Sequence, residues 1–213
     1  MRPARMLMQN SVFAALLLLL PGAASATLLS ALAGTSQSIG ALTFAFTKVE
    51  IAGSLDPTQI DLSLVSDGLG TGFDVTPVSA GAMSVLNGAI ADVKLEFTVT
   101  ATTGITQAGN HLVGTAVGAG SSASVSELID EAPAVDLGVF VASFASLPDN
   151  VQDLGATLFT LHVTKNIVIS ADEPGSASVE RLSQRFLVPE PTTATLMMLG
   201  ISGLAWSGRR REG

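Results

Sequence analysis

The chain has 213 residues, a formal net charge of −8 and no cysteine, and 47% of its residues are hydrophobic. The absence of cysteine excludes a disulfide framework, a thiolate metal site and a cysteine nucleophile. The length fits one domain once the two ends are set aside. Residues 27–187 contain five basic and sixteen acidic residues, a net charge of −11. Such a surface repels nucleic acid and anionic lipid headgroups, so neither is an expected partner.

Residues 1–26 have the three parts of a secretory signal peptide. Two arginines, Arg2 and Arg5, precede a nine-residue apolar stretch at 12–20, which is too short for a stable membrane anchor. A Pro-Gly pair and small residues follow, as signal peptidase requires. We predict cleavage between Ala26 and Thr27, with cleavage after Ala24 as the alternative. The expected signal-peptidase residues are therefore Ala24, Ala26 and Thr27.

The central part, residues 27–187, alternates apolar and polar residues with the period of β-strands. The clearest run is 93–100, where Val, Leu, Phe and Val alternate with Lys, Glu and Thr. Similar runs cover 42–46, 60–64, 135–141 and 159–169, and 176–187 is a candidate last strand. Turn-forming Gly, Pro, Asn and Asp residues separate these runs. The pattern predicts an all-β ectodomain, an antiparallel β-sandwich.

Two segments of the body have no clear period. Ser124 to Glu131 is compatible with one or two helical turns, and Gly81 to Ala91 fits neither a helix nor a strand well. No part of the body sustains the 3.6-residue period of a long amphipathic helix.

The C-terminal segment 188–213 combines three different elements. Its first four residues read Val-Pro-Glu-Pro, and the two prolines keep them extended. Residues 192–208 carry no formal charge and would span roughly 25 Å as a helix, near the short limit for crossing a bilayer. An arginine cluster follows and should stay on the cytoplasmic side. The residues concerned are Val188, Pro189, Glu190, Pro191, Arg209, Arg210 and Arg211.

This order of elements resembles the PEP-CTERM sorting signal of bacterial surface proteins. The resemblance implies that an exosortase recognises Pro189-Glu190-Pro191 and removes the tail, whereas the alternative is an anchor that is never cut. The body also resembles ectodomains that occur ahead of this tail, through T-Q-A-G-N-H-L-V-G-T at 106–115 and S-V-E-R-L-S-Q-R-F at 178–186. Those ectodomains imply no activity for this chain.

Residues suited to catalysis or metal binding are few. His111 and His162 with a carboxylate such as Asp136 have the right chemistry for zinc or copper, but their spacing matches no known metal motif. No serine lies in a G-x-S-x-G motif, and the body has no tryptophan or tyrosine to line a sugar cleft. We therefore predict no enzyme activity, no cofactor and no metal site.

One acidic loop is a weak candidate for calcium. Asp67 and Asp74 flank a glycine-rich bend, and extracellular calcium sites use such oxygen ligands. The spacing fits no EF-hand loop, and a flexible hairpin connection explains the glycines equally well.

These features predict an exported, exosortase-processed surface or extracellular-matrix protein of a Gram-negative bacterium. Its expected role is structural or adhesive, and the resemblance implies association with exopolysaccharide or biofilm. The alternative is an extracellular module that binds a carbohydrate or a protein, with calcium as an optional aid. The expected partners are signal peptidase, exosortase, the inner membrane before processing, and exopolysaccharide or other surface proteins.

Overall fold

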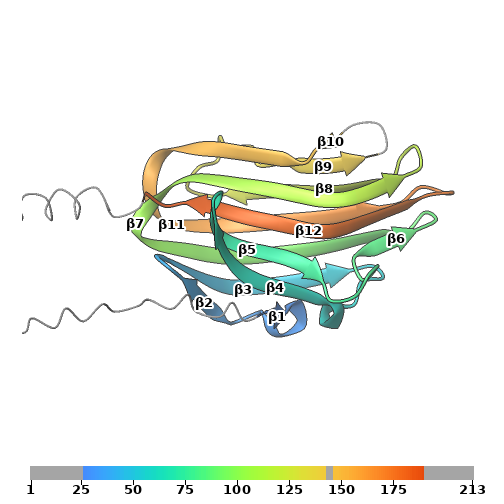
Figure 1. Cartoon of the computed structure of the whole chain (residues 1–213), viewed down its shortest axis with the longest axis horizontal. Helices are drawn as coiled ribbons and strands as arrows, with labels where there is room; N and C mark the ends of the chain where they lie inside the picture. The colour runs from blue at the N-terminus through green and yellow to red at the C-terminus, as the bar shows by residue number, and fades with distance from the viewer. Residues whose placement is uncertain (1–25, 143–145, 190–213) are drawn as a thin grey trace, which may run out of the picture.

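A computed structural model describes residues 26–142 and 146–189, which form an all-β, antiparallel fold (Figure 1). The predicted signal peptide up to residue 25 and the predicted membrane segment 192–208 lie outside the described residues. The elements are β1 (Thr27–Leu28), η1 (Leu29–Ala31), β2 (Ser36–Ile39), β3 (Leu42–Ala52), η2 (Pro57–Gln59), β4 (Ile60–Asp67), β5 (Gly70–Pro77), β6 (Ser84–Leu86), β7 (Ile90–Val117), β8 (Ser122–Ile129), β9 (Val139–Ala142), β10 (Ser146–Leu147), β11 (Asp149–Ser170) and β12 (Ser176–Leu187).

Two long strands, β7 and β11, join the described strands into one folded sheet. Residues 92–101 of β7 pair with β3, whereas residues 107–117 of the same strand pair with β12. β11 follows β7 through the same bend. The first layer therefore holds β2, β3, β8, β9 and β10, and the second holds β1, β4, β5, β6 and β12. The all-β antiparallel prediction is confirmed, and its sandwich-like layers are two parts of one continuous sheet.

Glycines at the bend explain how β7 and β11 turn together. Gly104 in β7 has a positive φ, +83°, and a Cβ atom added there would overlap the side chain of Thr157. Gly155 in β11 also has a positive φ, +73°, and its amide donates to the Asp153 carboxylate at 2.7 Å. The β7–β11 register shifts between Asp153 and Leu158. Both long strands thus change direction at residues that tolerate left-handed backbone.

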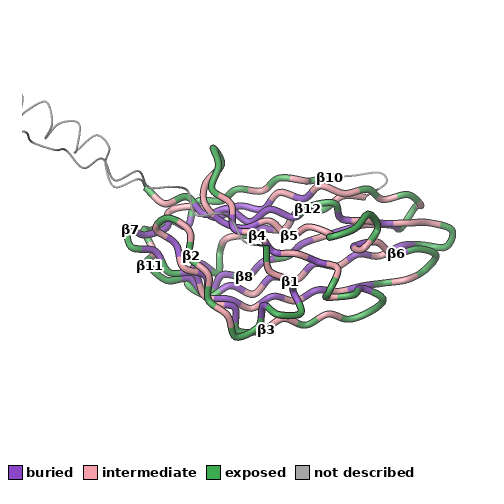
Figure 2. The backbone as a smooth tube through the Cα atoms, turned by 60° about the horizontal axis from the view of Figure 1, so that its bottom comes forward, coloured by how far each residue is buried: buried purple, intermediate pink, exposed green. Residues whose placement is uncertain are grey.

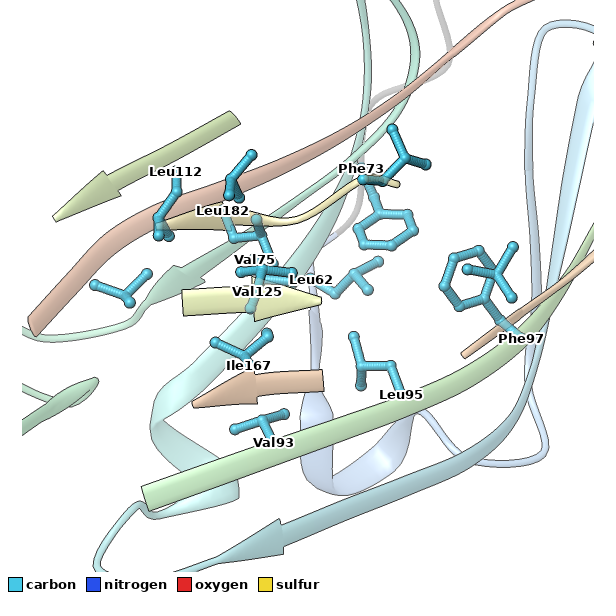
Figure 3. Close-up of a cluster of buried hydrophobic side chains, with 14 of the residues drawn as sticks. Leu62, Phe73, Val75, Val93, Leu95, Phe97, Leu112, Val125, Ile167 and Leu182 are labelled. Atoms are coloured by element: carbon cyan, nitrogen blue, oxygen red, sulfur yellow. The ribbon is translucent and has the colours of Figure 1, made fainter. Parts of the chain in front are cut away.

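The core lies between the two layers and follows the period of two along each strand. Figure 2 shows buried and more exposed positions alternating along the strands. Figure 3 shows side chains of both layers pointing towards one another, with Phe97 and Ile167 from the first layer and Phe73 and Leu182 from the second. The rings of Phe73 and Phe97 meet edge to face across the layers, with centroids 5.4 Å apart.

The structure corrects several details of the predicted strands. The suggestion of a helix at Ser124 to Glu131 is wrong, because β8 occupies Ser122–Ile129 and buries every second residue. Within 135–141 only Val139 onward is strand. Phe159, expected on the apolar face with Leu161, is 58% exposed because the register shift at the bend reverses the pattern. The last strand at 176–187 is confirmed as β12.

Replacing Phe73 with alanine should lower the free energy of unfolding by about 3–5 kcal/mol, since it leaves a cavity among the rings of Phe44, Phe46 and Phe97. The matched control is Phe159→Ala, which removes an exposed ring and should change stability by less than about 0.5 kcal/mol. Urea denaturation followed by circular dichroism measures both. Equal losses in the two variants would contradict the proposed packing of the layers.

Candidate functional site

A groove of about 320 Å³ lies on the outer face of the second layer, over β7, β11 and β12. Three rows of directly paired residues cross these strands, in the order β12, β7, β11. The floor of the groove lies at Gly109, which has no side chain. Two exposed apolar side chains stand at its sides, Leu69 with an exposed fraction of 73% and Val151 with 66%. The rows are Ser183, His111 and Asp149; Arg185, Gly109 and Val151; and Leu187, Gln107 and Asp153.

The first row brings a serine, a histidine and an aspartate together in this groove. His111 Nδ1 contacts the Asp149 carboxylate, and Ser183 is the direct neighbour of His111 on the other side. These are the residue types of a nucleophilic triad. However, no hydrogen bond joins Ser183 to His111, and the strand amides around them are engaged in the sheet ladder. The row therefore lacks the nucleophile–base hydrogen bond that defines such a site.

Arg185 occupies the position between the two calcium candidates. Its Nε and one terminal nitrogen donate to Asp67 at 3.1 and 2.9 Å, and its other terminal nitrogen lies 2.9 Å from an Asp74 oxygen. Its guanidinium also donates to the Phe73 carbonyl at 3.0 Å. The structure thus does bring Asp67 and Asp74 together, but around a guanidinium group that already supplies the positive charge.

The electrostatics of this cluster follow from the same contacts. The hydrogen bonds from Arg185 hold the pKa of Asp67 below its ordinary value. Burial acts to lower the pKa of Arg185, but its hydrogen bonds to Asp67 and the charges of both carboxylates raise that pKa above its ordinary value. Both shifts keep the ion pair charged at neutral pH.

The three residues considered for a zinc or copper site do not meet. His162, in β11, pairs with Glu131, whereas His111 pairs with Asp149 and Asp136 accepts the Gly138 amide at 3.0 Å. Within the described residues, no group of three or more His, Asp or Glu side chains is placed to hold a metal ion. The side chain of His162 is 58% exposed and faces solvent.

A buried polar cluster between the layers was missed from the sequence. The Lys165 ammonium contacts the Glu127 carboxylate and donates to Asn110 Oδ1 at 2.5 Å. The Asn110 amide nitrogen donates to Glu127 at 3.3 Å and to the Leu137 carbonyl at 3.0 Å, and Gln184 donates to Glu127 at 3.3 Å. The side chains of Lys165 and Glu127 are both 0% exposed.

The signal for this cluster is present in the strand period. Lys165 follows Leu161 and Val163 and precedes Ile167 at every second position of β11, so the pattern places its side chain in the core. Glu127 interrupts the buried face of β8 in the same way. A charged residue at an inward position of a strand is rare unless it is paired.

The described chain begins and ends close to the two predicted processing sites. β1 begins at Thr27, the residue that the prediction places directly after signal-peptide cleavage, and Thr27 pairs with Leu62. β12 ends at Leu187, next to the predicted sorting motif, and Val188 packs against the core. Ala24, Glu190, Pro191 and the arginine cluster lie outside the described residues. No helix among residues 26–142 and 146–189 is long and apolar enough to cross a membrane.

Residues 187–211 match the PEP-CTERM protein-sorting motif. The chain therefore carries this motif at its C-terminal end, as the sequence pattern predicted. The motif implies an exported protein with a membrane-anchored precursor and an exosortase as its processing partner. No curated protein matches the chain.

Two solved structures show a distant likeness to the chain. One is the enzymatically active domain of bacteriophage CBA120 tailspike protein 4, with 14% identity, a TM-score of 0.28 and coverage of 66% of this chain and 19% of that one. The chain thus spans about a fifth of that domain. The other is TmCBM61 in complex with β-1,4-galactotriose, with 9% identity, a TM-score of 0.29 and coverage of 66% and 90%. At these TM-scores neither likeness supports an inference about fold or function.

The pair of His162 and Glu131 gives a prediction about pH. The hydrogen bond to Glu131 raises the pKa of His162 above its ordinary 6.5. Partial burial acts to raise the pKa of Glu131, but the hydrogen bonds from His162 lower it below its ordinary 4.5. The histidine contribution to stability is complete below pH 6.5 and is lost as the pH rises through the folded pKa, and the glutamate contribution is lost as the pH falls below 4.5. The pair should therefore stabilise most between these values.

NMR titration of the two histidines tests this assignment. In Glu131→Gln the pKa of His162 should fall towards its ordinary value, while the exposed-site control Glu180→Gln should leave it unchanged. An unchanged pKa of His162 in Glu131→Gln would show that the carboxylate does not stabilise the imidazolium.

Proposed function

We propose that the chain is the precursor of a surface or extracellular-matrix protein of a Gram-negative bacterium, with a structural or adhesive role in association with exopolysaccharide. The observation that carries the proposal is the sorting motif at 187–211, which begins at the last residue of β12. The acidic, cysteine-free body suits a protein that works outside the cell and depends on its own core for stability.

Processing at both ends would release this body. Signal peptidase would cut after Ala26, leaving Thr27 at the start of β1, and an exosortase would act near Pro189-Glu190-Pro191. Because β12 lies between β5 and β7, the sorting motif follows a strand that is held on both sides. Little chain separates the folded body from the motif, so the body should remain close to the membrane until the tail is cut.

The fate of the tail tests the proposal in a host that contains an exosortase. The mature protein should lose the residues beyond the Pro-Glu-Pro region, whereas Glu190→Ala or deletion of Arg209, Arg210 and Arg211 should leave the tail attached. The exposed Glu180→Ala serves as the matched control and should be processed normally. Mass spectrometry of the C-terminal peptide measures each case, and an intact wild-type tail would refute the processing.

A second candidate function is binding of a carbohydrate or a protein in the groove over β7, β11 and β12. The supporting observation is the groove itself, which combines His111, Asp149 and Gln107 with exposed apolar groups. Binding sites commonly join an apolar lining to a few polar groups in this way. Calcium assistance is a weaker part of this candidate, because the Arg185 guanidinium already pairs with both Asp67 and Asp74.

Titration of the full chain against a glycan array, with and without calcium, tests this candidate. If the groove binds, Leu69→Ser should weaken saturable binding at least tenfold, while Leu86→Ser, which changes an exposed leucine outside the groove, should not. Equal binding by both variants would exclude the groove. A calcium-dependent rise in affinity would be needed to assign Asp67 and Asp74 to a metal site.

We propose further that the body is not an enzyme, because Ser183 makes no hydrogen bond with His111 in their shared row. The same purified chain can be treated with a fluorophosphonate, which labels activated serines. Labelling that disappears in Ser183→Ala but persists in Ser178→Ala would contradict this proposal.

A further inference from the structure

The buried cluster of Lys165, Asn110 and Glu127 joins the two layers of the fold. Lys165 and Glu127 are directly paired across β11 and β8 in the first layer. Asn110 lies in the second-layer part of β7, where it is paired with Gln184 of β12. The contact between Lys165 and Asn110 therefore crosses the space between the layers. All of these side chains are enclosed, with Asn110 only 2% exposed.

We propose that Lys165 and Asn110 form an intramolecular amide bond, with Glu127 transferring the protons. The bond would run from Lys165 Nζ to Asn110 Cγ, between side chains that already touch. Lys165 Nζ lies 2.5 Å from Asn110 Oδ1, the oxygen bonded to the carbon that would be attacked. Bringing a nucleophile and a carbonyl carbon into lasting contact supplies a large part of the barrier of such a reaction.

Glu127 is placed for proton transfer in both directions. One of its oxygens, Oε2, accepts hydrogen bonds from Lys165 Nζ and, at 3.3 Å, from Asn110 Nδ2. The same carboxylate thus contacts the attacking nitrogen and the nitrogen that must leave. A general base must reach the proton that it removes, and here one group can deliver that proton to the leaving group. Gln184 holds the other carboxylate oxygen at 3.3 Å.

The reaction is a condensation that needs no oxidant and no cofactor. The neutral Lys165 amine attacks Asn110 Cγ, the Nζ–Cγ bond forms, and a proton passes from Nζ to Glu127. The protonated Glu127 then gives that proton to Asn110 Nδ2, the Cγ–Nδ2 bond breaks, and ammonia leaves. The product is a secondary amide, and the carboxylate of Glu127 is regenerated.

The surroundings favour both the nucleophile and the product. Burial lowers the pKa of Lys165, while the Glu127 charge opposes this shift, so the neutral amine is more accessible than at the surface. The Leu137 carbonyl accepts from Asn110 Nδ2 at 3.0 Å and fixes the orientation of the amide. The other two lysines of the body, Lys48 and Lys94, are partly exposed and form ion pairs with surface glutamates, so they lack this environment.

The trypsin sites of the chain make the bond directly measurable. Trypsin cuts after Lys94, Lys165 and Arg181, and no Lys or Arg lies between residues 94 and 165. An unmodified chain therefore yields separate peptides 95–165 and 166–181. Modified Lys165 resists trypsin, so the proposed bond yields a single 95–181 peptide lighter by one molecule of ammonia.

The test uses the purified full chain, denatured and digested, with liquid chromatography and mass spectrometry. The wild type should give the light 95–181 peptide, and Asn110→Ala, Glu127→Gln and Lys165→Arg should each give the two separate peptides. Asn150→Ala, which changes the β11 neighbour of Asn110, should keep the linked peptide. Loss of ammonia at another asparagine would lower the mass of a peptide but leave Lys165 open to trypsin, so it would not give the linked peptide.

The wild-type result decides the proposal even where a variant does not fold. A wild-type chain that melts cooperatively and still yields separate 95–165 and 166–181 peptides would overturn it. A light 95–181 peptide that persists in Glu127→Gln would leave the bond but remove the assigned role of Glu127 as proton carrier, and so would contradict the mechanism.

Discussion

The pairing of β7 with β11 on both sides of the bend constrains the whole structure. Because one ladder runs through both layers, the layers cannot slide past each other without breaking hydrogen bonds in each of them. The ladder extends from the pair of Asp149 and His111 to that of Ser170 and Ile90. It therefore fixes which side chains face one another across the core. The contact between Asn110 and Lys165 depends on this geometry, since the bend folds one half of the strand pair over the other.

The buried charges in that contact need a physical reason to exist. A buried ion pair is often no more stabilising than apolar residues of the same volume, because desolvation offsets the attraction. The contacts of the cluster form only when β7, β8, β11 and β12 are all in their observed register, so the cluster can help to specify that register. A covalent bond would give the cluster a second purpose, because an exported chain without cysteine has no disulfide available to link its layers.

The sequence predicts the β architecture well because the strand period reflects burial on one face. Alternation at 93–100 and 176–187 places the strands correctly. The helix suggested at Ser124 to Glu131 is wrong because Glu127, a charged residue, occupies an inward position of β8 and hides the alternation of a strand. The same charged residue at an inward position indicates the buried pair. The expected position of Phe159 is wrong for a different reason, because the register shifts between Asp153 and Thr160, next to Gly155, reverse the phase of β11.

The candidate sites are less predictable because they depend on cross-strand register. Nothing in the sequence indicates that Ser183, His111 and Asp149 share a row, since they come from three strands far apart in the chain. Arg185 is likewise distant in sequence from Asp67 and Asp74, so the sequence does not indicate that a guanidinium group lies between those two weak calcium candidates. By contrast, the sorting motif at 187–211 is a continuous segment, and local order alone identifies it.

The position of the proposed bond also has a mechanical consequence for a protein that is held by its C-terminal tail. Force on the tail would act first on β12, which passes it to β7 through their shared ladder. Gln184 of β12 is paired directly with Asn110 of β7, so force on β12 would reach the buried cluster through a single pair of neighbouring strands. A bond from Asn110 to Lys165 would carry the force on to β11 in the other layer, adding a covalent link at the cluster to the backbone connections through β7 and β11. The strand that precedes the tail, β12, would then be hydrogen-bonded directly to the strand that carries the covalent link, β7.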